Sequence, residues 1–317
     1  MNDNREKAQH AAKRPLGDIV YSILTRGAAG AVIIIAIGIV ISLAGNSWPA
    51  IQKFGIHFLV DTTWNPVIFE FGALSSIAGT LISTIIAMVI AVPLSVIIAF
   101  FLVELAHPVL SKPIGYAIEL LAAVPSIIYG MWGLFVFAPF MADHIQPALQ
   151  SWFPGFPLFK GPPMGIGMLS AGIILALMVL PFITAVMRDV FQMVPSVVKE
   201  ASYGMGSTTV ETARHVTVKY GFSGLLGAVF LGLGRAVGET MAVTFVIGNS
   251  HEISASLFAA GNTIASTLAN EFTEAAEPLY ISALIELGLV LFVMTLVIQI
   301  MAQWWIGRTQ KKAGAGL

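Results

Sequence analysis

Six long apolar stretches constrain the fold of this chain more than any other feature of its sequence. They are Gly27–Gly45, Gly72–Val103, Ile114–Met141, Gly165–Met187, Gly224–Gly248 and Tyr280–Ile306. Each is close to or above the length of about 20 residues that a helix needs to cross a hydrocarbon core of roughly 30 Å. Because the stretches are continuous and do not alternate in polarity, they favour helices over barrel strands. The sequence therefore predicts an all-α integral membrane protein with six transmembrane helices.

The composition excludes an ordinary soluble protein. Charged residues make up 10% of the 317 residues and hydrophobic residues 57%, whereas soluble proteins carry roughly 25% charged residues. With so few charges, a soluble domain of this size could not cover its surface. The chain also has no cysteine, which excludes disulfides and thiolate metal sites.

Basic residues predict the orientation of the helices. The loops on one side hold only Lys53 and Lys160, whereas the tails and the connections on the other side hold Arg5, Lys7, Lys13, Arg14, Arg26, Lys112, Arg188, Lys199, Arg214, Lys219, Arg308, Lys311 and Lys312. The positive-inside rule then places both termini in the cytoplasm. A signal peptide ending at Ser42-Leu43-Ala44 is disfavoured by the long basic leader. We expect a multi-pass protein of the cytoplasmic (inner) membrane.

Three segments are expected along the chain: a basic cytoplasmic tail at 1–26, a six-span domain at 27–306 and a cytoplasmic tail at 307–317. The longest cytoplasmic connection, 188–223, lies between spans four and five. Its position makes it the part of the domain most accessible to a soluble partner.

This connection is predicted to form two short helices. Pro195-Ser196 is a typical helix start, Gly204 and Gly206 interrupt the helix, and Thr208-x-x-Glu211 is a capping box that begins the next one. A helix–glycine–helix elbow of this kind suits a docking surface for a soluble protein. A plain helical connector is the alternative on pattern alone.

Motifs for chemistry within the chain are absent. The sequence has no Gly-x-x-x-x-Gly-Lys-Ser/Thr loop for nucleotide phosphates and no Gly-x-Ser-x-Gly elbow. The six histidines lack a second ligand at helical spacing, so no metal site is predicted. We expect neither catalysis nor a bound cofactor in this chain, and no nucleic-acid partner.

Four charged residues fall inside the predicted spans. An ionised side chain at mid-bilayer costs at least roughly 2.5–3.5 kcal/mol, so each needs a reason. Glu119 lies near the cytoplasmic end of span three and is expected to reach the interface or cap a helix. Glu286 lies deeper, in span six, where a functional role and a structural pairing are equally compatible with the pattern.

Arg235 lies at the middle of span five, and Glu239 follows four residues later, on the same face of a continuous helix. The planar guanidinium group matches the geometry of phosphate and carboxylate. We therefore predict a substrate pathway formed by Arg235, Glu239 and Glu286. A structural ion pair between Arg235 and Glu239 is the alternative.

The cytoplasmic elbow resembles a known sequence element. Glu200-Ala201-Ser202-Tyr203-Gly204-Met205-Gly206 is similar to the EAA loop of ABC importer permeases. Ser202 replaces the second alanine of that motif, and Lys219 stands where the family has a proline. The resemblance implies that Glu200, Ala201, Ser202 and Gly206 couple the chain to an ATPase.

Three further runs narrow the resemblance to PstC-type permeases of phosphate importers, and similarity extends from Gly17 to Arg308. They are Glu119–Phe135, Gly232–Asn249 and Ile285–Phe292. The resemblance implies the type I ABC importer permease fold and phosphate transport by alternating access. It also implies four kinds of partner: a second, PstA-like permease, a dimer of a PstB-type ATPase that binds ATP and Mg, an extracytoplasmic phosphate-binding protein and membrane lipid.

Other functions are compatible with the same residues. An ion-coupled secondary anion transporter would use Glu119, Glu239 and Glu286 as a proton relay. A membrane scaffold would use them for packing alone. A permease of an importer for sulfate or molybdate would use Arg235 in the same way as one for phosphate.

Overall fold

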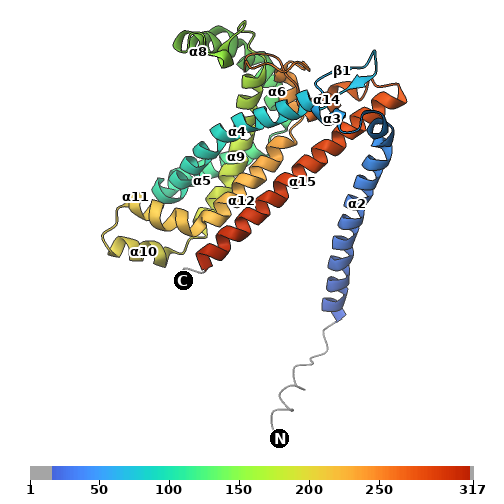
Figure 1. Ribbon diagram of the computed structural model, residues 1–317. Coiled ribbons are helices and arrows are strands. Elements are labelled where there is room, and N and C mark those ends of the chain that lie inside the picture. Colours follow the sequence, from blue (N-terminus) through green and yellow to red (C-terminus); the bar gives the residue numbers. More distant parts are fainter. Residues whose placement is uncertain (1–15, 315–317) are drawn as a thin grey trace.

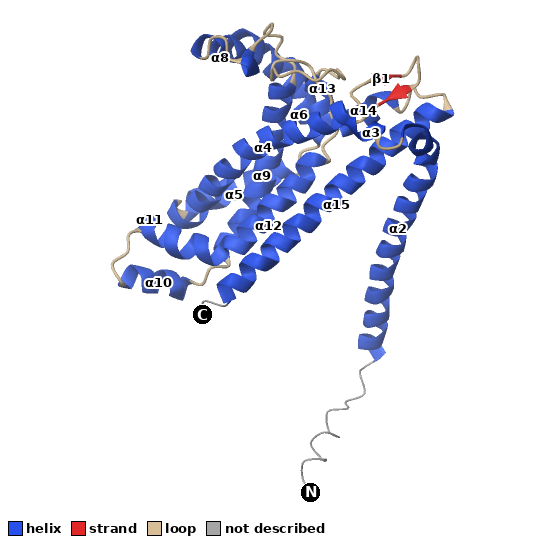
Figure 2. Cartoon of the chain, in the orientation of Figure 1, coloured by secondary structure: helices blue, strands red, loops and turns tan. Residues whose placement is uncertain are grey.

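The computed structural model describes residues 16–314, and almost all of them are helical (Figure 2). Residues 1–15 and 315–317, which belong to the predicted tails 1–26 and 307–317, lie outside the described residues. The long helices run side by side between two ends of the molecule (Figure 1). We call the end that carries β1, β2, α3 and α14 the capped end. The end that carries α10 and α11 is called the basic end.

The helices and short strands follow one another in this order: α2 (Leu16–Phe54), α3 (His57–Val60), β1 (Trp64–Asn65), β2 (Glu70–Phe71), α4 (Leu74–Phe100), π-helix η1 (Phe101–Leu105), α5 (Pro108–Ala122), α6 (Ser126–Trp132), π-helix η2 (Gly133–Phe137), α7 (Ala138–Phe140), π-helix η3 (Met141–Ile145), α8 (Gln146–Trp152), 3₁₀-helix η4 (Pro157–Phe159), α9 (Met168–Gln192), α10 (Ser196–Gly204), α11 (Thr209–Thr212), π-helix η5 (Ala213–Thr217), α12 (Val218–Val237), α13 (Met241–Ile247), α14 (Ile264–Glu271) and α15 (Pro278–Gly314). The strands β1 and β2 pair antiparallel, with Trp64 opposite Phe71.

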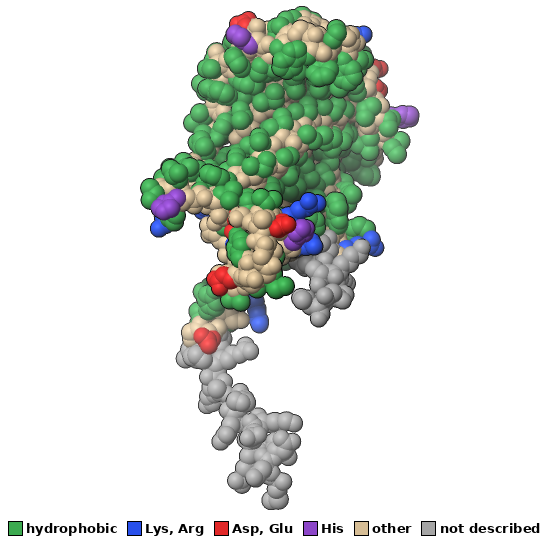
Figure 3. Space-filling view, turned by 90° about the vertical axis from the view of Figure 1, so that its left-hand side faces the viewer, with side chains coloured by type: hydrophobic (Ala, Val, Ile, Leu, Met, Phe, Trp, Pro, Cys, Tyr) green, Lys and Arg blue, Asp and Glu red, His purple; other side chains and the backbone are tan. Residues whose placement is uncertain are grey.

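Within the described part of the chain, six helical segments are long and apolar enough to cross a membrane, as the sequence predicts. They are Val20–Phe54, Leu74–Leu105, Ser126–Trp152, Met168–Gln192, Thr209–Val237 and Pro278–Arg308. Figure 3 shows a broad hydrophobic band on one face of the molecule, with charged side chains gathered mainly below it. This distribution is that of a protein whose middle faces lipid.

The third span differs from the predicted stretch Ile114–Met141, because the helix is interrupted at residues 123–125. Pro125 lacks an N–H group and disfavours the helical conformation of the residue before it, so α5 ends at Ala122 and α6 begins at Ser126. The hydroxyl group of Tyr129 donates a hydrogen bond of 3.0 Å to the carbonyl of Leu121, which also accepts from the amide of Val124 at 3.2 Å. The candidate span therefore starts after the proline, and α5 packs beside α9 as a separate helix.

The main core lies where α9 packs against α4, α12 and α13. Small residues of α4, among them Ala87 and Ala91, are fully buried there and allow the helices to approach closely. The hydroxyl group of Ser95 donates to the carbonyl of Leu180 across the same interface, 3.1 Å away. The core thus fixes α9 as the central helix of the bundle.

Helix α2 stands apart from this bundle over most of its length and meets α15 near the capped end (Figure 1). The contact is pinned by Ser282, whose hydroxyl oxygen accepts from the amide of Ala50 at 3.1 Å and donates to the carbonyl of Asn46 at 2.9 Å. The side chains of α2 below this contact are mainly exposed. This helix therefore presents much of its apolar surface to the surroundings.

A buried acid organises the capped end. Glu271 hydrogen-bonds to His251 at 2.9 Å and accepts from Trp64 at 2.5 Å and from Tyr280 at 2.7 Å. Burial tends to raise the pKa of Glu271, but these three hydrogen bonds outweigh it and hold that pKa below its usual value. The acid therefore joins β1, α14, α15 and the loop that carries His251.

Candidate functional site

Span five is broken at its charged residues. Helix α12 ends at Val237 and α13 begins at Met241, so Gly238–Thr240 is not helical. The expectation that Arg235 and Glu239 share one face of a continuous helix is therefore wrong. The local cause is a low helix propensity, because Gly232, Gly234 and Gly238 surround the charged pair.

Arg235 lies in the last turn of α12 and is partly buried. Its guanidinium group lies 5.4 Å from the centre of the Phe182 ring of α9, in a cation–π contact. Its Nε atom is buried and has no hydrogen-bond partner. The group is thus held by a ring, while part of its hydrogen-bonding capacity is unused.

Glu239 begins the second half of the span. Its Oε1 atom accepts a hydrogen bond of 3.1 Å from the amide of Ala242 in the first turn of α13. A carboxylate at a helix N-terminus is favoured by the helix dipole, and a cation at a C-terminus is favoured likewise. No ion pair joins Arg235 to Glu239 in the structure, so each charge is partly offset by its own helix end.

Close helix packing fixes this break. A Cβ atom on Gly130 of α6 would lie 2.9 Å from the carbonyl oxygen of Met241, and one on Gly232 would lie 2.4 Å from Ile183 of α9. A Cβ atom on Gly234 would lie 2.6 Å from the side-chain nitrogen of Gln299, which brings α15 next to Arg235. Helices α6, α9 and α15 therefore all approach the break.

The arrangement is suited to an anion. Non-helical backbone within a membrane is tolerated where it is buried in protein or lines a water-filled path. At this break the unused N–H of Arg235 is a hydrogen-bond donor, and the side-chain amide of Gln299 lies beside Gly234, one residue before Arg235. The sequence analysis did not single out Phe182 or Gln299. Gln299 had a signal, because it is a lone glutamine in an apolar stretch.

The structure separates Glu286 from Arg235. Glu286 lies on α15, thirteen residues before Gln299, which corresponds to about 20 Å along a helix axis. Glu286 and Arg235 therefore do not lie side by side along the bundle. A role for Glu286 in a substrate pathway stays a prediction, and its own surroundings are described below.

Glu119 lies near the basic end, where its carboxylate forms an ion pair with Arg188 of α9. The expectation that this acid reaches the interface agrees with the exposed position of its side chain. The pair joins residues far apart in the sequence, and no local pattern indicated it. Among the described residues, no cluster of three or more acidic or histidine side chains forms a candidate metal site.

The predicted elbow is present at the basic end. Helix α10 begins at Ser196 after Pro195, and Thr208 and Glu211 form the reciprocal bonds of a capping box at the start of α11. Gly206 has a φ of +86°, a conformation that other residues adopt at a cost. The hydroxyl groups of Ser202 and Thr212 lie 2.9 Å apart and join the two helices.

The elbow is anchored to the bundle and is also open to a partner. Lys199 of α10 forms an ion pair of 2.5 Å with Glu104 of η1, which sequence reasoning did not predict. Glu200, Ala201 and Gly206 are exposed. Apolar side chains beside them are exposed too, and Met205 has 87% of its surface accessible. Exposed apolar residues at a charged end of a membrane protein indicate a protein contact.

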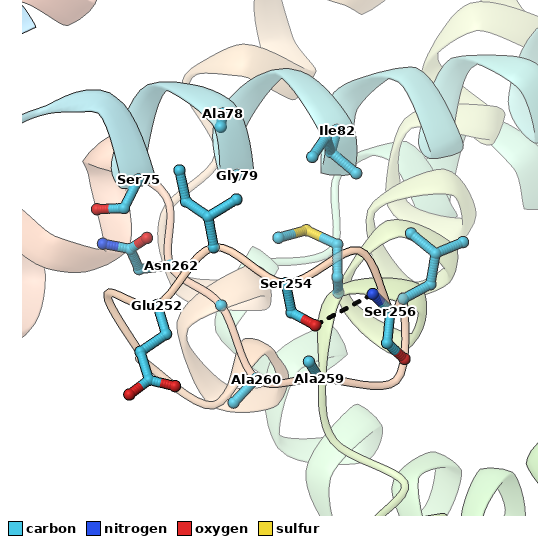
Figure 4. Close-up of a pocket in the computed structure, with 14 residues that line it drawn as sticks. Ser75, Ala78, Gly79, Ile82, Glu252, Ser254, Ser256, Ala259, Ala260 and Asn262 are labelled. Carbon is cyan, nitrogen blue, oxygen red and sulfur yellow. Dashed lines mark hydrogen bonds between the residues drawn. The ribbon is translucent and has the colours of Figure 1, made fainter. Parts of the chain in front are cut away.

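A small pocket at the capped end is not a substrate site. Figure 4 shows it between α4, at Ser75 and Gly79, and the loop that carries Glu252 and Asn262. Its volume is about 30 Å³, which is room for a water molecule. The charged break in span five is therefore the better candidate for contact with a larger anion.

Comparisons with known proteins give a consistent result. No protein-family model matches the sequence. A protein of Mesorhizobium japonicum named phosphate transport system permease protein PstC is 53% identical over 304 residues, covering 95% of this chain and 93% of that protein. One with the same name from Pasteurella multocida is 50% identical, covering 94% of each. A probable PstC from Methanocaldococcus jannaschii is 38% identical, covering 91% and 93%.

Solved structures agree on the fold. A chain of the MetNI methionine ABC transporter, in an inward-facing conformation, has a TM-score of 0.55 and 17% identity, covering 78% of this chain and 99% of that one. A chain of a bacterial alginate ABC transporter has a TM-score of 0.59 and 14% identity, covering 92% and 96%. At these identities the likeness concerns the fold alone, which is that of ABC importer permeases.

Proposed function

The chain belongs to the family of PstC phosphate transport permeases, and we propose that it is the transmembrane permease subunit of an ATP-binding-cassette importer that moves inorganic phosphate across the inner membrane. The observation that carries a pathway for the anion is the charged break in span five, with Arg235 on one side and Glu239 on the other. We assign phosphate rather than another oxyanion because the chain belongs to this family.

A permease of this class works in a complex with an ATPase and a binding protein. We propose a second, PstA-like permease, two copies of a PstB-type ATPase that bind ATP and Mg, and a phosphate-binding protein at the capped end. The exposed face of α6 and the apolar groove of about 530 Å³ between α4, α5, α6 and α9 support a contact with the second permease. The basic end would face the cytoplasm under the positive-inside rule.

The ATPase is expected to dock on the elbow of α10 and α11. Glu200, Ala201 and Gly206 are accessible for this contact, while Ser202 holds the two helices together. The helix that leaves the elbow is continuous from Thr209 to Val237. Helical backbone passes through Lys219 without interruption, although this chain has a lysine where the family has a proline.

This continuous helix supports a coupling mechanism. Arg235 lies 26 residues after Thr209, or about 39 Å along a helix axis. A displacement of the elbow on ATP binding would therefore be passed along α11, the π-helix η5 and α12 toward Arg235. We propose that the gate opens and closes at the break, where α13 can remain packed on α6 while α12 moves.

The test is phosphate uptake by cells that depend on this importer and carry Arg235→Gln. We expect uptake to fall at least about tenfold, since one hydrogen bond to a charged group commonly provides that much, with ATPase co-purification unchanged. Arg235→Lys should restore part of the uptake, because it restores the charge. Normal uptake by Arg235→Gln in an assembled complex would refute the pathway role.

Two related measurements address the alternatives. Uptake that stops with an uncoupler while ATP persists would favour a secondary transporter. Such a transporter would use Glu119 in a proton relay, and the ion pair of Glu119 with Arg188 argues against that role. Competition of labelled phosphate with sulfate and molybdate in the reconstituted complex would identify the preferred oxyanion.

A further inference from the structure

Glu286 lines a separate pocket at the junction of α2, α3, α4 and α15. The pocket has a volume of about 360 Å³. Apart from Glu286, its lining consists of glycine and apolar side chains: Ile51, Gly55, Leu59, Ile77, Leu289, Val290, Val293 and Met294. Its α15 residues follow Ser282, which contacts α2, and toward the basic end the two helices diverge (Figure 1).

The carboxyl group of Glu286 has no partner in this pocket. Its residue is 6% exposed, and its Oε2 atom is buried without a hydrogen bond. A buried carboxylate without a donor or a counter-charge is strongly unfavourable in an apolar setting. The lining supplies neither a basic side chain nor a side-chain N–H group. A donor from outside this chain would satisfy the carboxylate.

Along α15, the lining of the pocket changes from polar to apolar. Glu286 is the pocket residue of α15 nearest the capped end, and Leu289, Val290, Val293 and Met294 follow it along the helix toward the basic end. A lipid in the leaflet at the capped end has the same polarity, with its head toward that end and its chains toward the middle of the membrane.

The depth of Glu286 is compatible with a lipid head. The span Pro278–Arg308 has 31 residues, or about 46 Å of helix, which exceeds a hydrocarbon core of about 30 Å by roughly 8 Å at each end. Glu286 lies eight residues after Pro278, or about 12 Å along the axis. It therefore lies only about 4 Å inside the hydrocarbon boundary.

We propose that this pocket binds one phospholipid whose head carries a primary ammonium group, as phosphatidylethanolamine does, with the ammonium hydrogen-bonded to Glu286. An ammonium group supplies both the missing positive charge and the missing N–H donors. A quaternary choline head has the charge but no N–H group, and a head with net negative charge would be repelled. The acyl chain lies along Val290, Val293 and Met294.

The test is native mass spectrometry of the intact importer in detergent, with dioleoyl phosphatidylethanolamine, phosphatidylcholine or phosphatidylglycerol added at equal concentration. We expect one phosphatidylethanolamine to be retained about tenfold more than phosphatidylcholine, the ratio that a hydrogen bond to a charged group commonly gives. Glu286→Gln should reduce this preference to less than about twofold, since a neutral amide lacks the charge assistance.

Two further variants separate lipid binding from a loss of structure. Glu277→Gln removes an exposed acid just before α15 and should keep the preference. Val290→Trp fills the pocket without changing charge and should abolish retention of the lipid. An unchanged preference in Glu286→Gln, equal retention of all three lipids, or no retained lipid because a partner subunit covers the pocket would each overturn the proposal.

Discussion

Replacing Glu271 by glutamine should loosen the capped end in a pH-dependent way. The carboxylate of Glu271 is 18% exposed and takes part in three hydrogen bonds, with His251, Trp64 and Tyr280. A hydrogen bond to a charged acceptor contributes about 1 kcal/mol more than a neutral one. Because a glutamine keeps the shape and loses the charge at all three, Glu271→Gln should cost about 3 kcal/mol in local stability.

Hydrogen exchange of residues 249–271 in the purified protein measures this cost. A loss of about 3 kcal/mol corresponds to about 150-fold faster exchange at neutral pH, where exchange follows local opening. Glu274→Gln, which changes an exposed acid three residues later, is the matched control and should leave exchange unchanged.

The dependence on pH follows from the lowered pKa of Glu271. A carboxyl group whose folded pKa lies below its unfolded value of about 4.5 stabilises the folded state fully above that value. The contribution is lost as the pH falls through the folded pKa. The difference between wild type and Glu271→Gln should therefore be constant at neutral pH and shrink as the pH is lowered below about 4.5. Equal exchange at neutral pH, or a difference independent of pH, would refute the reasoning.

Three other substitutions test the contacts that position the sites. Lys199→Met leaves Glu104, whose side chain is 10% exposed, without its partner, so it should lower the stability of the folded protein by about 3 kcal/mol. In a thermal-stability assay, adding Glu104→Met should recover much of this loss. Additive losses in the double variant would contradict the pairing. Gly206→Val forces a φ of +86° on a branched residue and should destabilise the elbow by about 1–2 kcal/mol. We expect less ATPase to co-purify with this variant. Gly204→Ala, where an added Cβ has no atom within 4 Å, is the control. Gly130→Leu places side-chain atoms against the Met241 carbonyl and should abolish phosphate uptake. Ile128→Leu, at an exposed position of the same helix, is the control and should not. Normal uptake by Gly130→Leu would show that α6 and α13 need not touch.

Features encoded locally were predictable from the sequence. The six spans follow from apolar length, and the capping box at Thr208 and Glu211 is a four-residue pattern that marks a helix start locally. The break before Ser126 also had a local signal in Pro125, but the long apolar run around it concealed the interruption. Hydropathy reports which residues prefer lipid and does not report where a helix stops.

Features that depend on the fold were not predictable. The pairs Glu104–Lys199 and Glu119–Arg188 join segments 95 and 69 residues apart, and only the packing of α5, α9 and α10 brings them together. The break after Val237 has both causes, because the glycines around it lower the helix propensity and α13 is held by its contacts with α6 and α9. The spacing of Arg235 and Glu239 predicted neighbours on a helix, whereas tertiary packing placed them at two facing helix ends.

This placement changes what the two charges can do. On one continuous helix, four residues apart, they would largely neutralise each other. On separate helices, Arg235 belongs to α12, which leads back to the elbow, while Glu239 accepts from the amide of Ala242 in α13, the helix that packs on α6. A shift of α12 would then change the distance between a cation and an anion inside the membrane, and with it the electrostatic potential along the path of a passing phosphate. Under the proposed mechanism, the interaction between the two charges would depend on the position of the elbow, as a gate driven by an ATPase requires.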